Sequence, residues 1–414
     1  MKKPIVKLSL AVLSALVLGA CATSLEGPVA ASTAKRPQLT VEKAAQHTMA
    51  NYFAQGGMID APTNDPWDPV KNGIGDVSKF KPTYTVAADG SGTHKTVQAA
   101  VDAITAKGGT ERVYVLVKPG TYREQVCLKE TAPVTIYGES SDASKVLIVG
   151  NIGAGSKKDK EVTANACEGR KGADTYGTSG SSTFLAYSDG FQAKNITVSN
   201  DYDESPSPKS GTQAVALNTR GDKVILENVR LLGEQDTVMF KSKDMGLINR
   251  VFVTNSYIEG DVDFVFGRAV VVFDKVEFKS LTTRGGAEGG FVFAPSQPNN
   301  FPFGYLVTNS KFTSDGNKAG KTLHLGRSWD EGAAPLVTKD GGKHYPNGMV
   351  VIRNSYIGEH IAKEAPWAAA ASTNRPFDSE KEQTIQFGNP KVPTVYPVNR
   401  MFEFRNSGPG AAAK

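Results

Sequence analysis

A short β-rich frame recurs along the chain and constrains its fold more than any other feature. In each copy an Asn or Lys is followed by alternating apolar residues, as in KNITV, ENVRL and DKVEF. The anchors lie about 20 to 45 residues apart, which is the spacing of coil repeats with loop insertions. They are Asn195, Asn228, Asn255, Lys275, Asn309 and Asn354. Strands this short cannot bury a face alone but can when stacked, so the repeat predicts an all-β, right-handed parallel β-helix.

A β-sandwich is the alternative for so many short strands. It would favour tighter hairpin signals, and Asn-Gly pairs are few here. Helical spacing is confined to residues 41–55 and 94–105. We expect the second segment to form a short helix that caps the open N-terminal end of the solenoid.

The first residues have the layout of a bacterial secretory signal. Lys2 and Lys3 precede an apolar stretch that ends in Leu18-Gly19-Ala20-Cys21, which resembles a lipobox. The sequence predicts a signal peptide over 1–20, cleavage before a lipid-modified Cys21, a flexible tether over 21–40 and one β-helix domain over 41–414. Ala22 favours lipid anchoring in the outer membrane. A plain cleavable signal is the alternative.

An oxidising compartment makes a disulfide between Cys127 and Cys167 possible, although the two could equally be unrelated buried thiols. Elsewhere no apolar run is long enough for a membrane span. The net charge of +5 is too small to indicate nucleic acid as a partner.

Several catalytic classes are disfavoured by missing motifs. The chain has five His residues and no G-x-S-x-G elbow, which argues against a Ser-His-Asp hydrolase. It also has no H-E-x-x-H and no paired C-x-x-C, so we expect no metal site.

Carboxylates, amides and one Arg remain, in GEQDTVMF (233–240), GDVDFVFG (260–267) and LHLGRSWDEG (323–332). Asp236 and Asp263 are 27 residues apart, a plausible single coil, so they would stack about 4.8 Å apart. Two carboxyls that close cannot both ionise easily, so one can remain a general acid. Arg327 would hold the other as a nucleophilic carboxylate, and Gln235 could donate to an oxyanion.

Each motif also has an ordinary structural interpretation. An isolated Q-D-T is usually a turn, and Arg before Trp is often a surface cation–π pair. Strand alternation would place Asp261 and Asp263 on the same side of the ribbon, so periodicity does not choose between them.

The three stretches, in this order, resemble the pectin methylesterase (pectinesterase) family. The resemblance runs from about residue 83 to 411 and includes ADGSGTHKTVQAAVDAI (88–104), VLVKPGTYREQV (115–126), GTSGSSTF (177–184), TQAVAL (212–217) and FEFRNSGPGA (402–411). Lipid attachment at Cys21 would make this chain a bacterial lipoprotein member.

The resemblance implies a role for each matching residue. Asp263 would be the nucleophile and Asp261 a solvated neighbour; Asp236 would be the general acid and then the base. The remaining roles are oxyanion stabilisation by Gln213 and Gln235, alignment of Asp263 by Arg327, and sugar binding by Trp329, Phe266 and Thr178. Ser328 and Met239 depart from the family's usual Pro and Tyr; Ser328 would loosen the backbone beside Arg327.

Members of the family hydrolyse the C6 methyl ester of galacturonate units and release methanol, without a cofactor. The resemblance therefore implies a monomeric esterase acting on pectin or methylated oligogalacturonides. The alternatives are an envelope lipoprotein of this fold acting on another ester or thioester, a non-catalytic pectin-binding protein, and a pectate lyase, which would need clustered acids for Ca²⁺.

Overall fold

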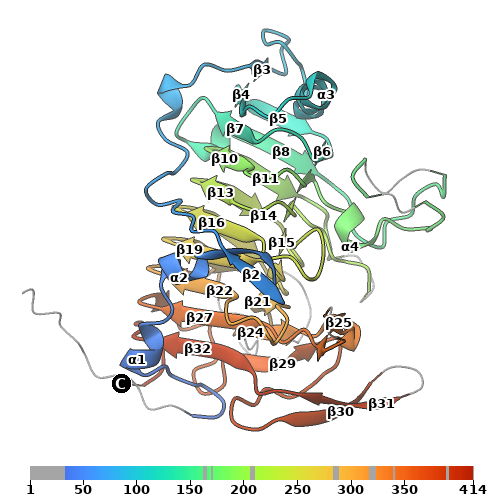
Figure 1. Ribbon diagram of the computed structural model, residues 1–414. Helices are drawn as coiled ribbons and strands as arrows, with labels where there is room; N and C mark the ends of the chain where they lie inside the picture. The colour runs from blue at the N-terminus through green and yellow to red at the C-terminus, as the bar shows by residue number, and fades with distance from the viewer. Residues whose placement is uncertain are drawn as a thin grey trace, which may run out of the picture.

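A computed structural model describes residues 33–161, 166–168, 171–205, 210–282, 289–316, 323–338, 341–387 and 391–413. Parallel strands stack into a single column, with successive coils lying one above the next (Figure 1). Each full coil contributes one strand to each of three parallel sheets. The predicted right-handed parallel β-helix is confirmed. The predicted signal peptide and Cys21 lie outside the described residues.

Sheet 1 has ten strands. In spatial order they are β3 (Tyr84–Val86), β4 (Val113–Val117), β7 (Val134–Gly138), β10 (Gln192–Lys194), β13 (Val224–Glu227), β16 (Arg250–Thr254), β19 (Val270–Asp274), β22 (Tyr305–Thr308), β27 (Met349–Arg353) and β32 (Arg400–Phe404).

Sheets 2 and 3 have eight strands each. Sheet 2 contains β5 (Gly120–Arg123), β8 (Val146–Gly150), β11 (Thr197–Asn200), β14 (Arg230–Leu232), β17 (Tyr257–Gly260), β20 (Glu277–Ser280), β23 (Lys311–Ser314) and β28 (Tyr356–Ile357). Sheet 3 contains β6 (Val126–Leu128), β9 (Phe184–Ala186), β12 (Leu217–Thr219), β15 (Val238–Phe240), β18 (Val265–Gly267), β21 (Phe291–Pro295), β24 (His324–Trp329) and β29 (Trp367–Ala371).

Short elements decorate the column. The helices and 3-10 turns are α1 (Val41–Ala44), α2 (Met49–Tyr52), α3 (Val97–Lys107), α4 (Gly177–Gly180), η1 (Val77–Lys79), η2 (Ala143–Lys145) and η3 (Glu331–Ala333). Three antiparallel hairpins pair β1 (Gln55–Met58) with β2 (Ala61–Asn64), β25 (Leu336–Val337) with β26 (Lys343–His344), and β30 (Gln383–Phe387) with β31 (Val392–Tyr396).

The recurrent anchor residues turn the chain from sheet 1 into sheet 2. All six adopt the left-handed backbone conformation, with φ between 49° at Asn255 and 59° at Asn195. Asn tolerates this conformation better than most residues because its short polar side chain can bond locally. In addition, Asn228 donates to Asn195 Oδ1 at 2.8 Å, which links equivalent corners of consecutive coils. The frame seen in the sequence is therefore a repeated corner.

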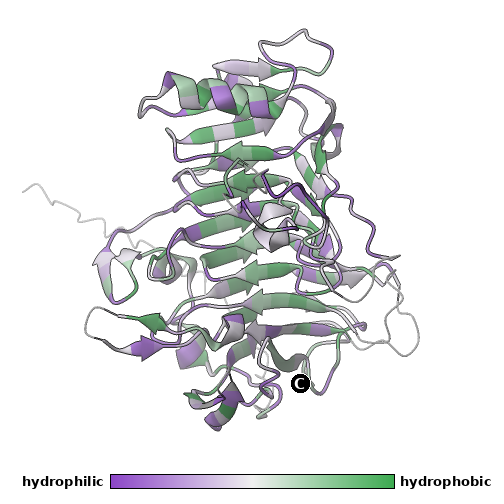
Figure 2. Cartoon of the chain, turned by 90° about the vertical axis from the view of Figure 1, so that its right-hand side faces the viewer, coloured by the Kyte–Doolittle hydropathy of each residue, from purple (hydrophilic) through white to green (hydrophobic). Residues whose placement is uncertain are grey.

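Inward-facing apolar side chains fill the column. In Figure 2 the stacked strands are mainly green, the colour of hydrophobic residues. Aromatic rings continue the stack inside, and Phe278 lies over Phe312 with ring centres 5.2 Å apart. Helix α3 covers the N-terminal end beside β3, β4 and β6, as predicted, and buries Val97, Val101 and Ile104.

The N-terminal segment differs from its prediction in two ways. Residues 41–55 do not form one helix: α1 and α2 are separate single turns, each capped by a Thr (Thr40 and Thr48). Two strong N-caps close together favour two helix starts over one continuous helix. The short helices pack against sheet 1 and bury Tyr52 and Phe53.

Residues 33–40 are not a flexible tether, although the sequence predicted one over 21–40. Residues 37–39 lie along β32, where Leu39 N donates to Glu403 O at 2.9 Å. Arg36 is 4% exposed and forms a two-point ion pair with Glu403 at 2.8 and 2.9 Å. This buried pair and the edge of sheet 1 together provide enough contacts to order the segment.

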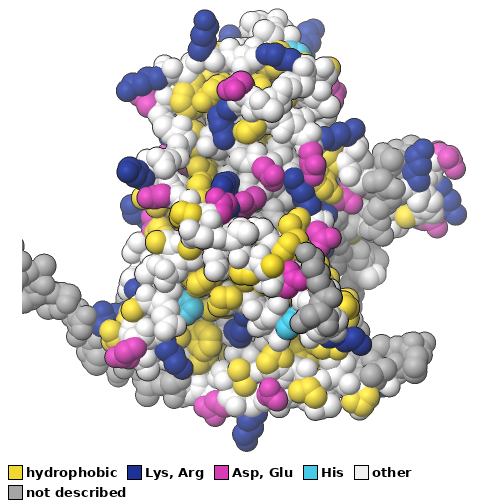
Figure 3. Space-filling model, in the orientation of Figure 1, with side chains coloured by type: hydrophobic (Ala, Val, Ile, Leu, Met, Phe, Trp, Pro, Cys, Tyr) yellow, Lys and Arg dark blue, Asp and Glu magenta, His cyan; other side chains and the backbone are white. Residues whose placement is uncertain are grey.

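Charges of both signs are interspersed on the face of the molecule seen in Figure 3, in keeping with the small net charge of the chain. Within the described residues, no helix is long and apolar enough to cross a membrane.

Candidate active site

Asp236 and Asp263 occupy equivalent positions on consecutive coils. Strand β15 pairs with β18 so that Val238 lies beside Val265 and Met239 beside Phe266. Each Asp comes two residues before its strand, so the two carboxylates stack across one coil spacing, about 4.8 Å. Both residues are left-handed, with φ of 63° and 50°, and both are more than 90% buried. The predicted juxtaposition is therefore present.

The stretch around Asp263 is a corner and not a continuous strand. Strand β17 ends at Gly260 and β18 begins at Val265, so strand alternation does not apply to Asp261 and Asp263. Asp261 is also not a solvated neighbour: it is 6% exposed, and its Oδ1 accepts a hydrogen bond from Val262 N at 2.5 Å. The next coil covers it, since Phe291 N donates to Asp261 O at 2.9 Å.

Arg327 grips Asp263 with two parallel hydrogen bonds. Its Nε donates to Oδ1 at 2.9 Å and one terminal nitrogen donates to Oδ2 at 2.7 Å. This two-point geometry fixes the plane of the carboxylate. The guanidinium lies over the ring of Phe291, 3.9 Å from the ring centre. The ring of His324 stacks on the same Phe291 ring, with ring centres 5.3 Å apart.

Asp236 has the opposite electrostatic setting. Burial raises its pKa well above the usual aspartate value, and the charge of Asp263 adds to the increase; Arg327 opposes it, and Asp261 contributes a further increase. One member of the pair is thus bound by an Arg, and desolvation and repulsion favour the protonated form of the other. The two carboxyls are set up for different chemical roles.

The amide residues lie beside the carboxyl pair. Thr212 Oγ1 donates to Gln235 Oε1 at 2.6 Å, which directs the NH₂ group of Gln235 away from Thr212. The backbone of Gln235 is fixed by Glu204, whose Oε1 accepts from Gln235 N at 2.6 Å. Gln213 is on the preceding coil, where the adjacent Ala214 N donates to Gln235 O at 3.0 Å.

An apolar patch adjoins the site on sheet 3. The rings of Phe266 and Trp329 are 5.6 Å apart, and Met239 packs into the same cluster. Thr178 is in α4, and its neighbour Ser179 contacts the Met239 sulfur at 3.8 Å. The three predicted sugar-binding residues therefore border one patch.

Ser328 is held from two sides, contrary to the expected loosening of the backbone beside Arg327. Its hydroxyl is 2.8 Å from Asp330 Oδ1 and accepts from Gly348 N at 3.1 Å. Asp330 in turn receives two hydrogen bonds of 3.0 Å from the fully buried Arg375. These hydrogen bonds restrict the backbone at Ser328 in place of the Pro ring that is usual in the family at this position.

A disulfide joins Cys127 and Cys167. It ties the long excursion between β8 and β9, which carries α4, to strand β6. Glu168, next to the second Cys, pairs with Arg220 at 2.9 Å. The cross-link thus holds one wall of the site.

Three residues that contact the site were not predicted from the sequence: Phe291, His324 and Glu204. The first two are the coil equivalents of Asp263 on β21 and β24. Aligning every coil strand by strand would have identified these two residues, but loops of unequal length between the strands obscure that alignment. Glu204 belongs to a loop and has no local signal.

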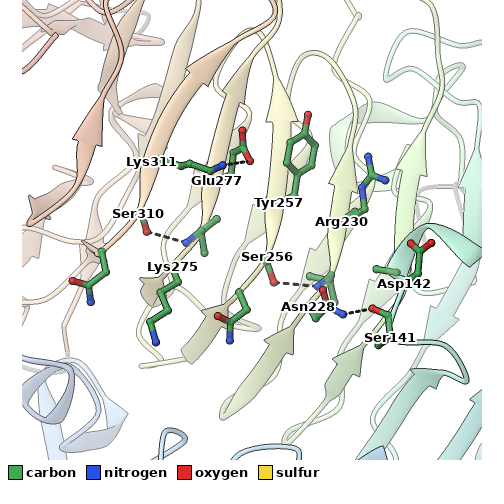
Figure 4. A pocket seen from close by; sticks show the side chains of 15 residues that line it. Ser141, Asp142, Asn228, Arg230, Ser256, Tyr257, Lys275, Glu277, Ser310 and Lys311 are labelled. Atoms are coloured by element: carbon green, nitrogen blue, oxygen red, sulfur yellow. Dashed lines mark hydrogen bonds and ion pairs between the residues drawn. The ribbon is translucent and has the colours of Figure 1, made fainter. Parts of the chain in front are cut away.

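A hollow lies at the corner between sheets 1 and 2, away from the carboxyl pair, and is shown in Figure 4. Its polar groups are bonded to one another: Lys311 pairs with Glu277 at 2.8 Å, and Asn228 donates to Ser141 O at 2.8 Å. Asp142 accepts from Ser144 at 2.6 Å. This hollow is a structural corner without a reactive pair. Nowhere in the described part of the chain do three or more His, Cys, Asp or Glu side chains form a group suited to a metal ion.

Comparison with known proteins gives a consistent picture. A family model described as Pectinesterase matches residues 83–339. A pectinesterase of Ralstonia solanacearum is 40% identical over 401 residues, covering 96% of this chain and 97% of that protein. The solved pectin methyl esterase of rice weevil has a TM-score of 0.71 at 30% identity and covers 92% of this chain and 99% of its own. The solved Escherichia coli protein YbhC has a TM-score of 0.72 at 31% identity, and the match covers 91% of this chain and 96% of YbhC.

Proposed function

The chain belongs to the pectinesterase family, and on this premise we propose that it hydrolyses the C6 methyl esters of galacturonate units in pectin, with Asp263 as the nucleophile. The observation that carries the assignment of roles is the unequal pair: Asp263 is gripped by Arg327, and Asp236, one coil away, has a raised pKa.

In the first half-reaction, an Asp263 oxygen attacks the ester carbonyl carbon and a tetrahedral anion forms. The amide NH₂ groups of Gln213 and Gln235 stabilise the negative oxygen. The bond from carbon to the methoxy oxygen then breaks, and Asp236 gives its proton to that oxygen, so that methanol leaves. An acyl-enzyme anhydride on Asp263 remains.

In the second half-reaction, Asp236 is a carboxylate and acts as the base. It takes a proton from water, whose oxygen attacks the same carbonyl carbon. Collapse of the anion breaks the bond to Asp263 and releases galacturonic acid, which gives its remaining proton to solvent and leaves as the carboxylate. Asp236 is protonated again and Asp263 is ionised again, so the cycle closes without a cofactor. Trp329, Phe266 and Thr178 are assigned to the sugar rings because they border the apolar patch beside this pair.

Methanol release from methylated pectin tests this function. Asp263→Asn and Asp236→Asn should each lower kcat by at least about 100-fold. Wild-type product should contain no unsaturated sugar ends, and a chelator should not change the rate. Unsaturated ends would indicate a lyase, and full activity of either variant would contradict the roles assigned here. Hydrolysis of acyl-CoA by the same samples tests the thioester alternative.

We also propose that Cys21 carries a lipid and anchors the enzyme in the bacterial outer membrane. The support is the Leu18-Gly19-Ala20-Cys21 sequence after an apolar stretch. An anchored enzyme meets diffusing fragments more easily than long polymers, so methylated oligogalacturonides should be preferred over intact pectin. Cys21→Ser should move the protein out of the membrane fraction, and a much higher kcat/KM on polymer would contradict the substrate preference.

A further inference from the structure

A third buried carboxyl lies beside the catalytic pair and takes no part in the proposed bond changes. Asp261 is 6% exposed and lies two residues before Asp263, in the corner between β17 and β18. Two backbone hydrogen bonds join this corner to the corner of Asp236 on the preceding coil. Asp236 N donates to Val262 O at 3.0 Å, and Asp261 N donates to Glu234 O at 3.1 Å. The backbone therefore holds Asp261 in the same small region as the pair.

The following coil closes directly over Asp261. Phe291 N donates to Asp261 O at 2.9 Å, and a Cβ on Gly290 would lie only 2.3 Å from that carbonyl oxygen. Glycine is the residue that permits such a close approach of two backbones. Because this closure keeps bulk water away, a charge on Asp261 acts on its neighbours with less screening than a surface charge.

The charged groups that act on Asp236 come from two elements, the corner 261–263 and strand β24. Burial raises the pKa of Asp236 most, and the charge of Asp263 raises it next; Arg327 lowers it, and Asp261 raises it further. Val262 N donates to Asp261 Oδ1 at 2.5 Å, a contact that favours the charged form of Asp261. Two negative charges and one positive charge thus act on the buried acid.

The same coil as Asp236 carries one further titratable neighbour, Glu234. Glu204 N donates to Glu234 Oε2 at 3.3 Å, which directs this side chain toward the loop of Glu204. The neighbouring side chains of Gln213 and Gln235 are neutral amides.

The covalent intermediate changes this balance of charge. As an acyl-enzyme anhydride, Asp263 is neutral and no longer repels a charge on Asp236, whereas Arg327 keeps its positive charge. Both effects make Asp236 a weaker base at the step in which it must take a proton from water. Asp261 is not acylated, so its charge is the same in both half-reactions.

We propose that Asp261 is a positioning residue for the catalytic proton: its buried carboxylate keeps this proton on Asp236 before methanol leaves and helps Asp236 to take a proton from water afterwards. This inference rests on the proposed function and deepens it. Asp261 forms no bond to the substrate and acts only through Asp236. The enzyme should therefore remain active to higher pH than it would without this third carboxylate.

The test is the pH profile of kcat/KM for methanol release from methylated pectin, because its alkaline limb reports the essential acid of the free enzyme. In Asp261→Asn the midpoint of this limb should fall by about one pH unit, so that kcat/KM at alkaline pH falls about tenfold. The Asn side chain keeps the oxygen that accepts from Val262 N and removes the charge. Asp261→Ser removes the same charge with a smaller side chain and replaces the Asn variant if that variant does not fold.

The matched control is Asp274→Asn, which makes the same substitution at a carboxylate of similar burial. Asp274 is 8% exposed, ends β19 in sheet 1 and accepts a hydrogen bond from Asn309 at 2.7 Å. This variant should leave the alkaline limb in place. An unmoved limb in the folded Asp261 variants, or an equal fall in Asp274→Asn, would overturn the inference.

Rapid-quench measurement of methanol release tests the second half-reaction. At pH 6 the ratio of the steady-state rate to the first-turnover rate should fall about threefold in Asp261→Asn, because the weaker base slows hydrolysis of the acyl-enzyme. A fall confined to the first turnover would contradict this part of the inference.

Infrared titration separates the inference from the proposed function, since no turnover is needed. The carbonyl band of protonated Asp236 is the band that Asp236→Asn lacks, and its midpoint should be about one pH unit lower in Asp261→Asn than in wild type. A lowered midpoint supports the role of Asp261 even if wild type releases no methanol, a result that would remove only the esterase function. An unchanged midpoint together with normal methanol release would remove only the role of Asp261.

Discussion

Replacing Asp236 by Asn should make the protein less active and more stable. Asp236 is 7% exposed and faces Asp263 one coil away, and burial followed by repulsion from Asp263 raises its pKa. The amide of Asn has nearly the same shape and no charge. The variant should therefore lose the general acid and at the same time relieve an unfavourable site, as removal of strained functional groups often does.

The sign of the pH dependence follows from the raised pKa. The unfolded chain releases this proton near pH 4, whereas the folded protein keeps it to higher pH. The folded state thus binds more protons in this window, and its stability falls as pH rises from about 4 toward the raised pKa of Asp236. The Asn variant has no such loss.

The expected gain is about 1–2 kcal/mol at pH 8 and near zero at pH 4. With about 2 cal/mol/K of unfolding entropy per residue, this corresponds to roughly 1–3 °C in Tm for a chain of this size. Scanning calorimetry of wild type and Asp236→Asn from pH 4 to 8 measures it. A lower Tm for the variant at pH 8, or a difference that does not change with pH, would refute the reasoning.

Asp201→Asn provides a control of opposite sign. The hydrogen bond from Arg123 is the main cause that lowers the pKa of Asp201. That carboxylate stabilises the fold above its usual pKa, and its contribution is lost as the pH falls. The variant should be less stable than wild type at neutral pH, and the difference should shrink toward acid pH.

Three further predictions concern contacts around the site and the fold. Phe291→Ala should lower kcat about tenfold with little change in KM, because Arg327 loses the ring under its guanidinium; stopped-time methanol assays measure this, and a pure KM effect would contradict it. Cys127→Ser should cost about 2–4 kcal/mol of unfolding free energy and raise KM, because the disulfide-tethered wall loosens; urea unfolding and saturation kinetics of the variant check both effects. Arg36→Met should cost about 3 kcal/mol because the carboxyl of Glu403, 0% exposed, loses its ion-pair partner; an unchanged urea midpoint would show that this ion pair does not stabilise the N-terminal segment.

Much of the column could be predicted because its periodicity is local. Asn195 and its equivalents mark a left-handed corner that few residue types tolerate. This pattern can be recognised even though the loops between the corners differ in length. Asp236 and Asp263 could be placed together because the connection between β15 and β16 is short, so that their separation of 27 residues still corresponds to one coil.

Other parts of the site depend on long-range contacts and had no sequence signal. Phe291 becomes the platform of Arg327 only through coil stacking across variable insertions. The burial of Asp261 depends on the next coil covering it, whereas the resemblance to the family implied a solvated neighbour. Residues 33–40 have the composition of a tether, and contacts with the distant strand β32, including the ion pair between Arg36 and Glu403, order them.

The docking of residues 37–39 along β32 has a consequence for how an anchored enzyme would stand on a membrane. Thr33 is the twelfth residue after Cys21, so the contour from a lipid on Cys21 to Thr33 is at most about 40 Å. The coil of Asp263 is four strands from β32 in sheet 1, about 19 Å further along the column. The lipid would then act as a pivot beneath the last coil, and the carboxyl pair would reach substrate within a layer roughly 60 Å deep above the bilayer. Only the portion of a polymer that enters this layer could be de-esterified.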